Sequence, residues 1–150
     1  MTSFQTTLSL LSEILAQKKS ALLQILNICE NQETVLLGTL APDETYSFFG
    51  GMNAEKQTLI DSVIQSDEMF SRMFEKVRGI FDENAKENKD NITLLQAEIK
   101  ETMEIDIKIR LQEEKNKMYL SKLKQSAKID MPKKPKAYIL EQYKKNSERP

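Results

Sequence analysis

Hydrophobic residues recur at helical spacing along almost the whole chain, and residues that interrupt helices are scarce. Only four glycines and four prolines occur among the 150 residues. Spacings of three, four and seven residues are typical of an amphipathic helix. Two stripes with these spacings are Phe4, Leu8, Leu11, Leu15, Leu22, Ile25, Cys29 and Met52, Leu59, Val63, Phe70, Met73, Val77, Ile80. The sequence therefore predicts an all-α fold made of a few long helices.

Lapses in the apolar pattern divide the chain into three helices. We expect them at about residues 3–35, 53–88 and 91–128. The second and third have nearly equal lengths and are separated by a short turn at Lys89-Asp90-Asn91. This arrangement predicts a long antiparallel hairpin with the N-terminal helix packed on it.

Residues 36–51 are expected to connect the first helix to the hairpin. Gly38 ends the first apolar stripe, and Pro42 suits the first turn of a new helix. Gly50 and Gly51 would weaken a helix there by about 1 kcal/mol each. The segment is therefore predicted to be a connector or a short helix.

The third helix is expected to place nine residues along one seam, namely Leu95, Ile99, Thr102, Asp106, Ile109, Glu113, Asn116, Leu120 and Leu123. Ile105–Leu111 alternates apolar and polar residues like a strand, but a strand has no partner here, so helix is favoured. Its apolar residues would then cover two adjacent faces and require more than one neighbouring helix.

The polar seam residues Asp106, Glu113 and Asn116 leave two interpretations open. They either fix the register of packed helices, as buried Asn does in coiled coils, or they are exposed. If this end of the helix extends beyond its neighbours, its face could bind an amphipathic helix of another protein. The residues predicted to bind a substrate protein are Ile109, Glu113, Asn116, Met118, Tyr119, Leu120 and Leu123.

The composition gives little support to an enzymatic function. The chain contains no histidine and one cysteine, Cys29. An internal disulfide cannot form, and the usual zinc sites of several Cys and His cannot be assembled. No phosphate-binding glycine loop, dinucleotide fingerprint, nucleophile–histidine pair or EF-hand spacing occurs. We therefore expect no enzymatic activity, no cofactor and no metal.

We expect neither a signal peptide nor a membrane anchor. No basic segment precedes an apolar run at the N-terminus, and no apolar stretch approaches the roughly 20 residues that span a bilayer. The single cysteine suits a reducing compartment. These features predict a cytoplasmic protein without direct membrane insertion.

Charge is distributed unevenly along the chain. Residues 1–114 contain 11 basic and 20 acidic side chains, whereas residues 115–150 contain 11 basic and 3 acidic ones. The acidic body would repel nucleic acid, and the tail tyrosines are too sparse to stack bases. An acidic protein partner suits the basic tail better, and nucleic acid is not an expected partner.

The last residues differ in composition from the rest. Residues 1–129 are expected to form the helical domain, and residues 130–150 a basic, partly disordered tail. Met131–Lys136 reads as an extended linker because of its two prolines. A short apolar and aromatic cluster follows, formed by Tyr138, Ile139, Leu140 and Tyr143. It is either a docking motif that folds on contact or a frayed terminus.

Five segments carry a resemblance to a known family, namely Leu10–Leu15, Met52–Ile60, residues 67–78, Gln112–Lys117 and Gln142–Asn146. They resemble segments of the FlgN/FliT-like flagellar export chaperones. The resemblance covers most of residues 8–146.

The resemblance implies a cytoplasmic, non-enzymatic type III flagellar export chaperone. A FlgN-like member binds the C-terminal helical segment of a hook–filament junction protein, prevents its premature association and delivers it to the export gate. Tyr138, Ile139, Leu140 and Tyr143 are the expected gate-docking residues. The alternatives are a FliT-like chaperone for the filament-cap protein and a coiled-coil adaptor that self-associates. A chaperone is expected to be a monomer or a small homo-oligomer.

Overall fold

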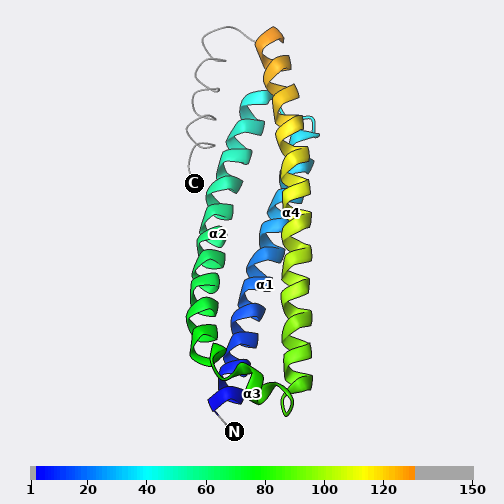
Figure 1. Ribbon diagram of the computed structural model, residues 1–150. Helices are drawn as coiled ribbons and strands as arrows, with labels where there is room; N and C mark the ends of the chain where they lie inside the picture. Colours follow the sequence, from blue (N-terminus) through cyan, green and yellow to red (C-terminus); the bar gives the residue numbers. More distant parts are fainter. Residues whose placement is uncertain (1–2, 131–150) are drawn as a thin grey trace. The chain divides into compact units, whose positions relative to one another are not determined.

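The computed structural model describes the backbone of residues 3–130 and the side chains up to residue 126. Its helices are α1 (Ser3–Leu36), α2 (Pro42–Arg78), α3 (Phe81–Ala85) and α4 (Lys89–Asp130) (Figure 1). They account for 92% of residues 3–130, and no strand occurs within this range. The predicted all-α fold is therefore confirmed, with Ile105–Leu111 helical.

The predicted connector at residues 36–51 is wrong, because α2 already begins at Pro42. Pro42 occupies the first turn, where its missing N–H costs nothing. Asp43 and Glu44 follow it at the positive end of the helix dipole. Only residues 37–41 remain as the connection.

Gly50 and Gly51 lie inside α2 although each costs about 1 kcal/mol relative to alanine. Tyr46 and Phe49 offset this cost, because both are buried and pack in one cluster with Leu120 of α4. Packing of an apolar face stabilises most helices in proteins more than intrinsic propensity does.

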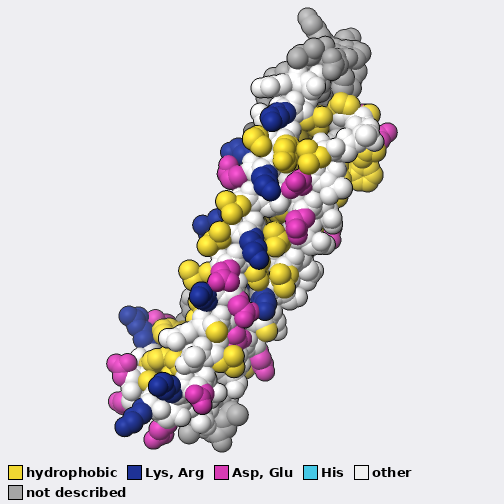
Figure 2. Space-filling model, turned by 90° about the vertical axis from the view of Figure 1, so that its right-hand side faces the viewer, with side chains coloured by type: hydrophobic (Ala, Val, Ile, Leu, Met, Phe, Trp, Pro, Cys, Tyr) yellow, Lys and Arg dark blue, Asp and Glu magenta, His cyan; other side chains and the backbone are white. Residues whose placement is uncertain are grey.

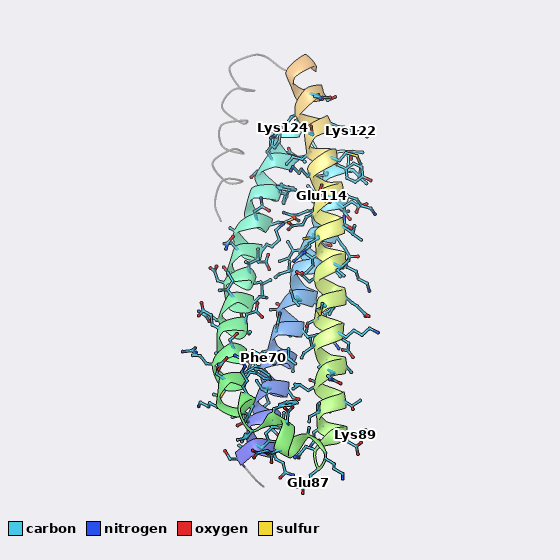
Figure 3. The ribbon with its side chains drawn as sticks, viewed as in Figure 1. Phe70, Glu87, Lys89, Glu114, Lys122 and Lys124 are labelled. Atoms are coloured by element: carbon cyan, nitrogen blue, oxygen red, sulfur yellow. The ribbon has the colours of Figure 1, made fainter. Side chains whose placement is uncertain are left out.

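The predicted turn at residues 89–91 is also wrong. The turn region lies earlier, because α2 ends at Arg78 and the short α3 precedes α4. Two asparagines stabilise it through backbone carbonyls: Asn84 Nδ2 donates to Ile80 O at 2.7 Å, and Asn88 Nδ2 donates to Asn84 O at 2.8 Å. Glu87 and Lys89 lie at the entry to α4 (Figure 3).

Helices α1, α2 and α4 each contribute to two compact units. The first unit combines α1 up to Gln24 with Ile60–Ile107. The second combines Ile25–Leu59 with α4 from Lys108 onward.

The core of the first unit joins the beginning of α1 to the end of α2 and the beginning of α4. Its buried residues are Phe4, Leu8, Leu11, Leu15, Val77 and Leu95. Phe70 lies on the side of α2 that faces α1 (Figure 3). The Phe81 ring of α3 meets the Phe4 ring edge-on, with centroids 5.6 Å apart. Within this unit α2 and α4 are therefore antiparallel, as predicted.

Ion pairs flank this core. Lys18 Nζ lies 2.7 Å from Asp67 Oδ1, which links α1 to α2. Lys19 Nζ lies 2.5 Å from Glu101 Oε2, which links α1 to α4. Because these groups are partly exposed, each pair contributes at most about 1 kcal/mol.

The core of the second unit contains Leu36, Tyr46, Phe49 and Leu120. Tyr119 and Leu123 of α4 are half-buried against it. The end of α1, the beginning of α2 and the C-terminal half of α4 thus meet in this cluster.

The predicted seam of α4 is largely confirmed. Leu95, Thr102, Ile109, Asn116 and Leu120 are buried, at helical spacing. The expected coverage of two faces at Ile105–Leu111 is wrong. Ile105 and Ile109 are buried, but Ile107 and Leu111 are exposed, because neighbouring helices cover only one side of α4.

Candidate functional site: a buried polar network and exposed apolar side chains

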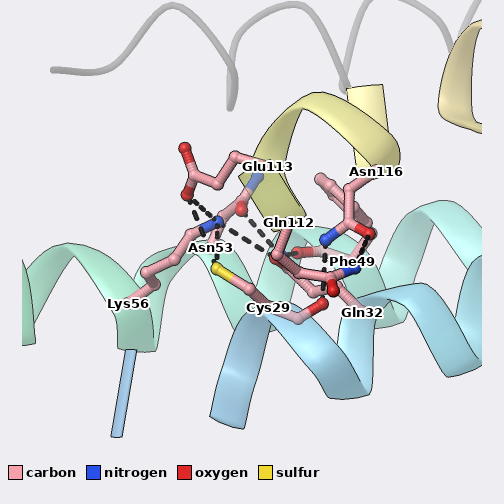
Figure 4. A network of polar contacts seen from close by, with 8 residues as sticks. All are labelled: Cys29, Gln32, Phe49, Asn53, Lys56, Gln112, Glu113 and Asn116. Atoms are coloured by element: carbon pink, nitrogen blue, oxygen red, sulfur yellow. Dashed lines mark hydrogen bonds and ion pairs between the residues drawn. The ribbon is translucent and has the colours of Figure 1, made fainter. Parts of the chain in front are cut away.

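A polar network joins all three long helices within the second unit (Figure 4). Cys29 and Gln32 come from α1, and Phe49, Asn53 and Lys56 from α2. The α4 members are Gln112, Glu113 and Asn116.

Gln32 is at the centre of this network and is fully buried. Its Oε1 accepts a hydrogen bond from Lys56 Nζ at 3.0 Å. Its Nε2 donates to Asn53 Oδ1 at 2.8 Å and to the backbone oxygen of Phe49 at 3.5 Å. One amide therefore bonds to three groups of α2, which fixes the position of α2 on α1.

Lys56 points inward, and only 12% of its side chain is exposed. Its ammonium lies 2.9 Å from Glu113 Oε1 of α4, whose side chain is about half-exposed. A buried ammonium needs such a partner, because desolvation of an unpaired charge costs several kcal/mol. The pair thus links α2 to α4.

Asn116 links α4 to α1 and is 3% exposed. Its Nδ2 donates to the backbone oxygen of Cys29 at 2.8 Å. Its Oδ1 accepts from Gln112 Nε2 at 3.1 Å, and Gln112 Nε2 also donates to the Glu33 carboxylate. Both ends of the Asn116 amide are therefore used within the unit.

Burial raises the pKa of the Cys29 thiol from 9.0 to about 11. Lys56 opposes this shift, and the negative charge of Glu113 adds to it. The thiol is therefore protonated at neutral pH, and it is a poor nucleophile because the thiolate is the reactive form.

We predict that Cys29 of the folded chain reacts with a disulfide reagent at pH 8 at least about 100-fold more slowly than the unfolded chain, given its raised pKa and full burial. The measurement is absorbance after addition of the reagent, with and without denaturant. Because the folded-state pKa lies above the unfolded one, the thiol contributes stability below pH 9 that is lost as the pH rises towards 11. Rapid labelling of the folded chain would contradict the burial of this thiol.

We expect the network to act on helix register, because its partners must align for every bond to form. Of the three polar seam residues, Asn116 is buried, Asp106 is half-buried, and Glu113 is exposed and pairs with Lys56. A role in register stays a prediction. Among the side chains up to residue 126, no three His, Cys, Asp or Glu residues come together as metal ligands. No helix in the described range has the length and apolar character needed to cross a membrane.

The expected free face for a substrate protein is wrong for the buried members of the set. Ile109, Asn116 and Leu120 are buried by the chain itself. Leu120 packs with Tyr46 and Phe49 of the first turns of α2, which start earlier than expected. Asn116 is held instead by the backbone oxygen of Cys29 on α1. Of the remaining members, Met118 is exposed, and Tyr119 and Leu123 are half-buried. Glu113 forms the ion pair with Lys56.

The predicted gate-docking residues Tyr138, Ile139, Leu140 and Tyr143 lie outside the described residues. The boundary between a helical domain ending at residue 129 and a tail from residue 130 stays a prediction.

Sequence reasoning did not find Gln32, Asn53 and Lys56. A signal existed for Gln32, which follows Cys29 by three residues and precedes Leu36 by four, and so continues the first apolar stripe. A polar residue at such a position indicates a buried hydrogen-bonding group.

Large apolar side chains remain exposed on both units. Figure 2 shows one face on which hydrophobic side chains lie between charged groups of both signs. The first unit exposes Leu10, Leu23, Ile64, Met69, Ile80, Leu94, Met103 and Ile107. The second exposes Leu37, Leu40, Phe48, Leu111 and Met118. These residues are the available candidates for contact with a partner protein.

The fold and the network define a class, a long-helix protein whose buried polar groups hold its own helices together.

The sequence matches no protein-family model, and neither the curated proteins nor the solved structures contain a match.

Proposed function

We propose that the chain is a non-enzymatic, cytoplasmic flagellar export chaperone that binds a helical segment of a late flagellar substrate. The observation that carries this proposal is the set of large apolar side chains exposed on outer helix faces. In the second unit they include Phe48 of α2 and Leu111 and Met118 of α4. Such faces suit an amphipathic helix that lays its own apolar side on them.

The buried polar groups favour binding over catalysis. Gln32 and Asn116 bond to other groups of the same unit. Cys29 is held in its protonated form. These side chains are committed to holding helices together, and the outer faces remain for a partner.

The resemblance to FlgN/FliT-like chaperones narrows the partner. A FlgN-like chaperone would hold the C-terminal helical segment of a hook–filament junction protein until export. A FliT-like chaperone would hold the filament-cap protein instead. Delivery to the export gate would then involve Tyr138 and Tyr143 of the tail.

The test is co-expression of the chain with hook–filament junction and filament-cap proteins from a flagellated bacterium. Size-exclusion chromatography with light scattering should show a defined complex with one of them and a monomer or small homo-oligomer without it. A substrate lacking its C-terminal helical segment is the matched control and should not bind. Large oligomers of the chain alone, without any substrate complex, would favour the self-associating adaptor and reject the chaperone.

A further inference from the structure

The first turns of α2 present a distinct outward face in the second unit. Glu44, Phe48, Gly51 and Glu55 follow one another by four, three and four residues, which places them on one side of the helix. All four are exposed, and Phe48 is 55% exposed. We call these four residues the α2 outer stripe.

Among the residues that the structure describes, no contact explains why position 51 is a glycine. A Cβ placed on Gly51 would meet no atom of the described part of the chain within 4 Å, whereas one on Gly38 would lie 3.2 Å from the backbone oxygen of Thr34. No glycine in the described range has a positive φ, so backbone conformation does not require glycine here either. Glycine destabilises a helix interior relative to alanine. A glycine at an exposed helix position with free space around it therefore points to the close approach of another backbone.

The charge around the stripe has one sign. The exposed charged side chains of Pro42–Leu59 are Asp43, Glu44 and Glu55. The one basic residue of this segment, Lys56, turns inward to Gln32 and Glu113. The outer face of α2 therefore combines an exposed aromatic ring with carboxylates, and residues 42–59 contribute no exposed cation to it.

We propose that the α2 outer stripe binds a basic amphipathic helix of a partner protein. The apolar seam of that helix covers Phe48, and its backbone packs against Gly51. Lysines or arginines lie opposite Glu44 and Glu55, which are about 16 Å apart along the axis for eleven residues of α-helix. This deepens the proposed function and rests on it for the helical nature of the partner.

A second copy of this chain is a poorer occupant of the stripe. Two copies related by a two-fold axis would bring Glu44 and Glu55 of one chain against the same carboxylates of the other. Like charges brought together across an interface are unfavourable. A helix with flanking basic residues instead meets opposite charges on both sides of its apolar seam.

The decisive variant is Gly51→Ala, because its effects on stability and on binding have opposite signs. A methyl group in open space on a helix should raise the urea midpoint of unfolding. The same methyl group should separate the two helices and weaken binding by about tenfold or more. A purely structural role for Gly51 predicts no such loss of affinity.

The probe is a synthetic 21-residue amphipathic helix with leucines along its apolar seam and lysines beside it, titrated into the full chain by calorimetry. Phe48→Ala should weaken binding about tenfold or more. Ile64→Ala is the matched control, since Ile64 is a similarly exposed apolar residue of α2 in the first unit, and it should leave affinity unchanged. A peptide with glutamates in place of the lysines should not bind.

Three results would overturn this proposal. One is native affinity of both Phe48→Ala and Gly51→Ala for the lysine peptide. Another is equal binding of the glutamate peptide. The third is sedimentation showing self-association that Phe48→Ala abolishes, which would assign the stripe to a second copy.

The two proposals can fail independently. If the lysine peptide binds through Phe48 and Gly51 but no flagellar protein forms a complex, the stripe is retained and the chaperone function is rejected. If a flagellar protein binds equally to the native chain and to both variants, the function is retained and the stripe is rejected.

Discussion

Val77→Asp is expected to lower the free energy of unfolding by about 4 kcal/mol, enough to unfold a protein of ordinary stability partly. Val77 is 2% exposed and belongs to the core cluster of the first unit. The new carboxylate would be buried among Phe4, Leu11 and Leu95 with no cation in that cluster. Urea unfolding followed by far-ultraviolet circular dichroism measures the effect.

Met73→Asp is the control for this variant. Met73 lies one turn earlier on the same stripe and packs against the same core, but it is only half-buried. Its carboxylate can therefore reach water, and we expect a loss of less than about 2 kcal/mol. Native stability of both variants would show that this stripe of α2 is an exposed surface and not a core.

Gln32→Ala is expected to lower the free energy of unfolding by about 3 kcal/mol. The change removes the bonds to Asn53, Phe49 and Lys56 and leaves these groups with fewer partners in a buried site. It also leaves a cavity where a fully buried side chain had packed. The urea midpoint of the variant measures the loss.

The matched control for Gln32→Ala is Gln24→Ala. Gln24 is also on α1, but it is exposed and donates to Ser20 of the same helix, at 3.3 Å. We expect a change within about 0.5 kcal/mol. Equal losses in the two variants would mean that the network does not stabilise the second unit.

The predicted bounds of the first and third helices were accurate, whereas those of the second were not, because α2 spans Pro42–Arg78. α1 ends at Leu36, close to the expected residue 35, and the seven residues of the first stripe are all buried. Prediction from intrinsic helix propensity failed where tertiary packing stabilised the helix. Gly50 and Gly51 predicted a break, but burial of Tyr46 and Phe49 keeps this part of α2 helical.

The candidate site was predictable only in part. The seam of α4 identified Glu113 and Asn116 as polar residues at core positions, and both belong to the network. Their partners lie far away in the sequence: Lys56 is 57 residues from Glu113, and Cys29 is 87 residues from Asn116. Periodicity describes which side of a helix faces inward, but it contains no information on which residues of other helices meet there.

The sequence by itself determined the all-α class, the number of long helices and the inward face of the first helix, because spacing along one helix is set by its own geometry. Only the tertiary structure decided that α2 starts at Pro42 and packs on Leu120, and that Ile109 and Asn116 of the face expected to bind a partner are buried as well. Phe48 and Gly51 of the same part of α2 remain exposed. Which face is free depends on contacts between distant segments, and the free energy of those contacts exceeds the local cost of two glycines in a helix.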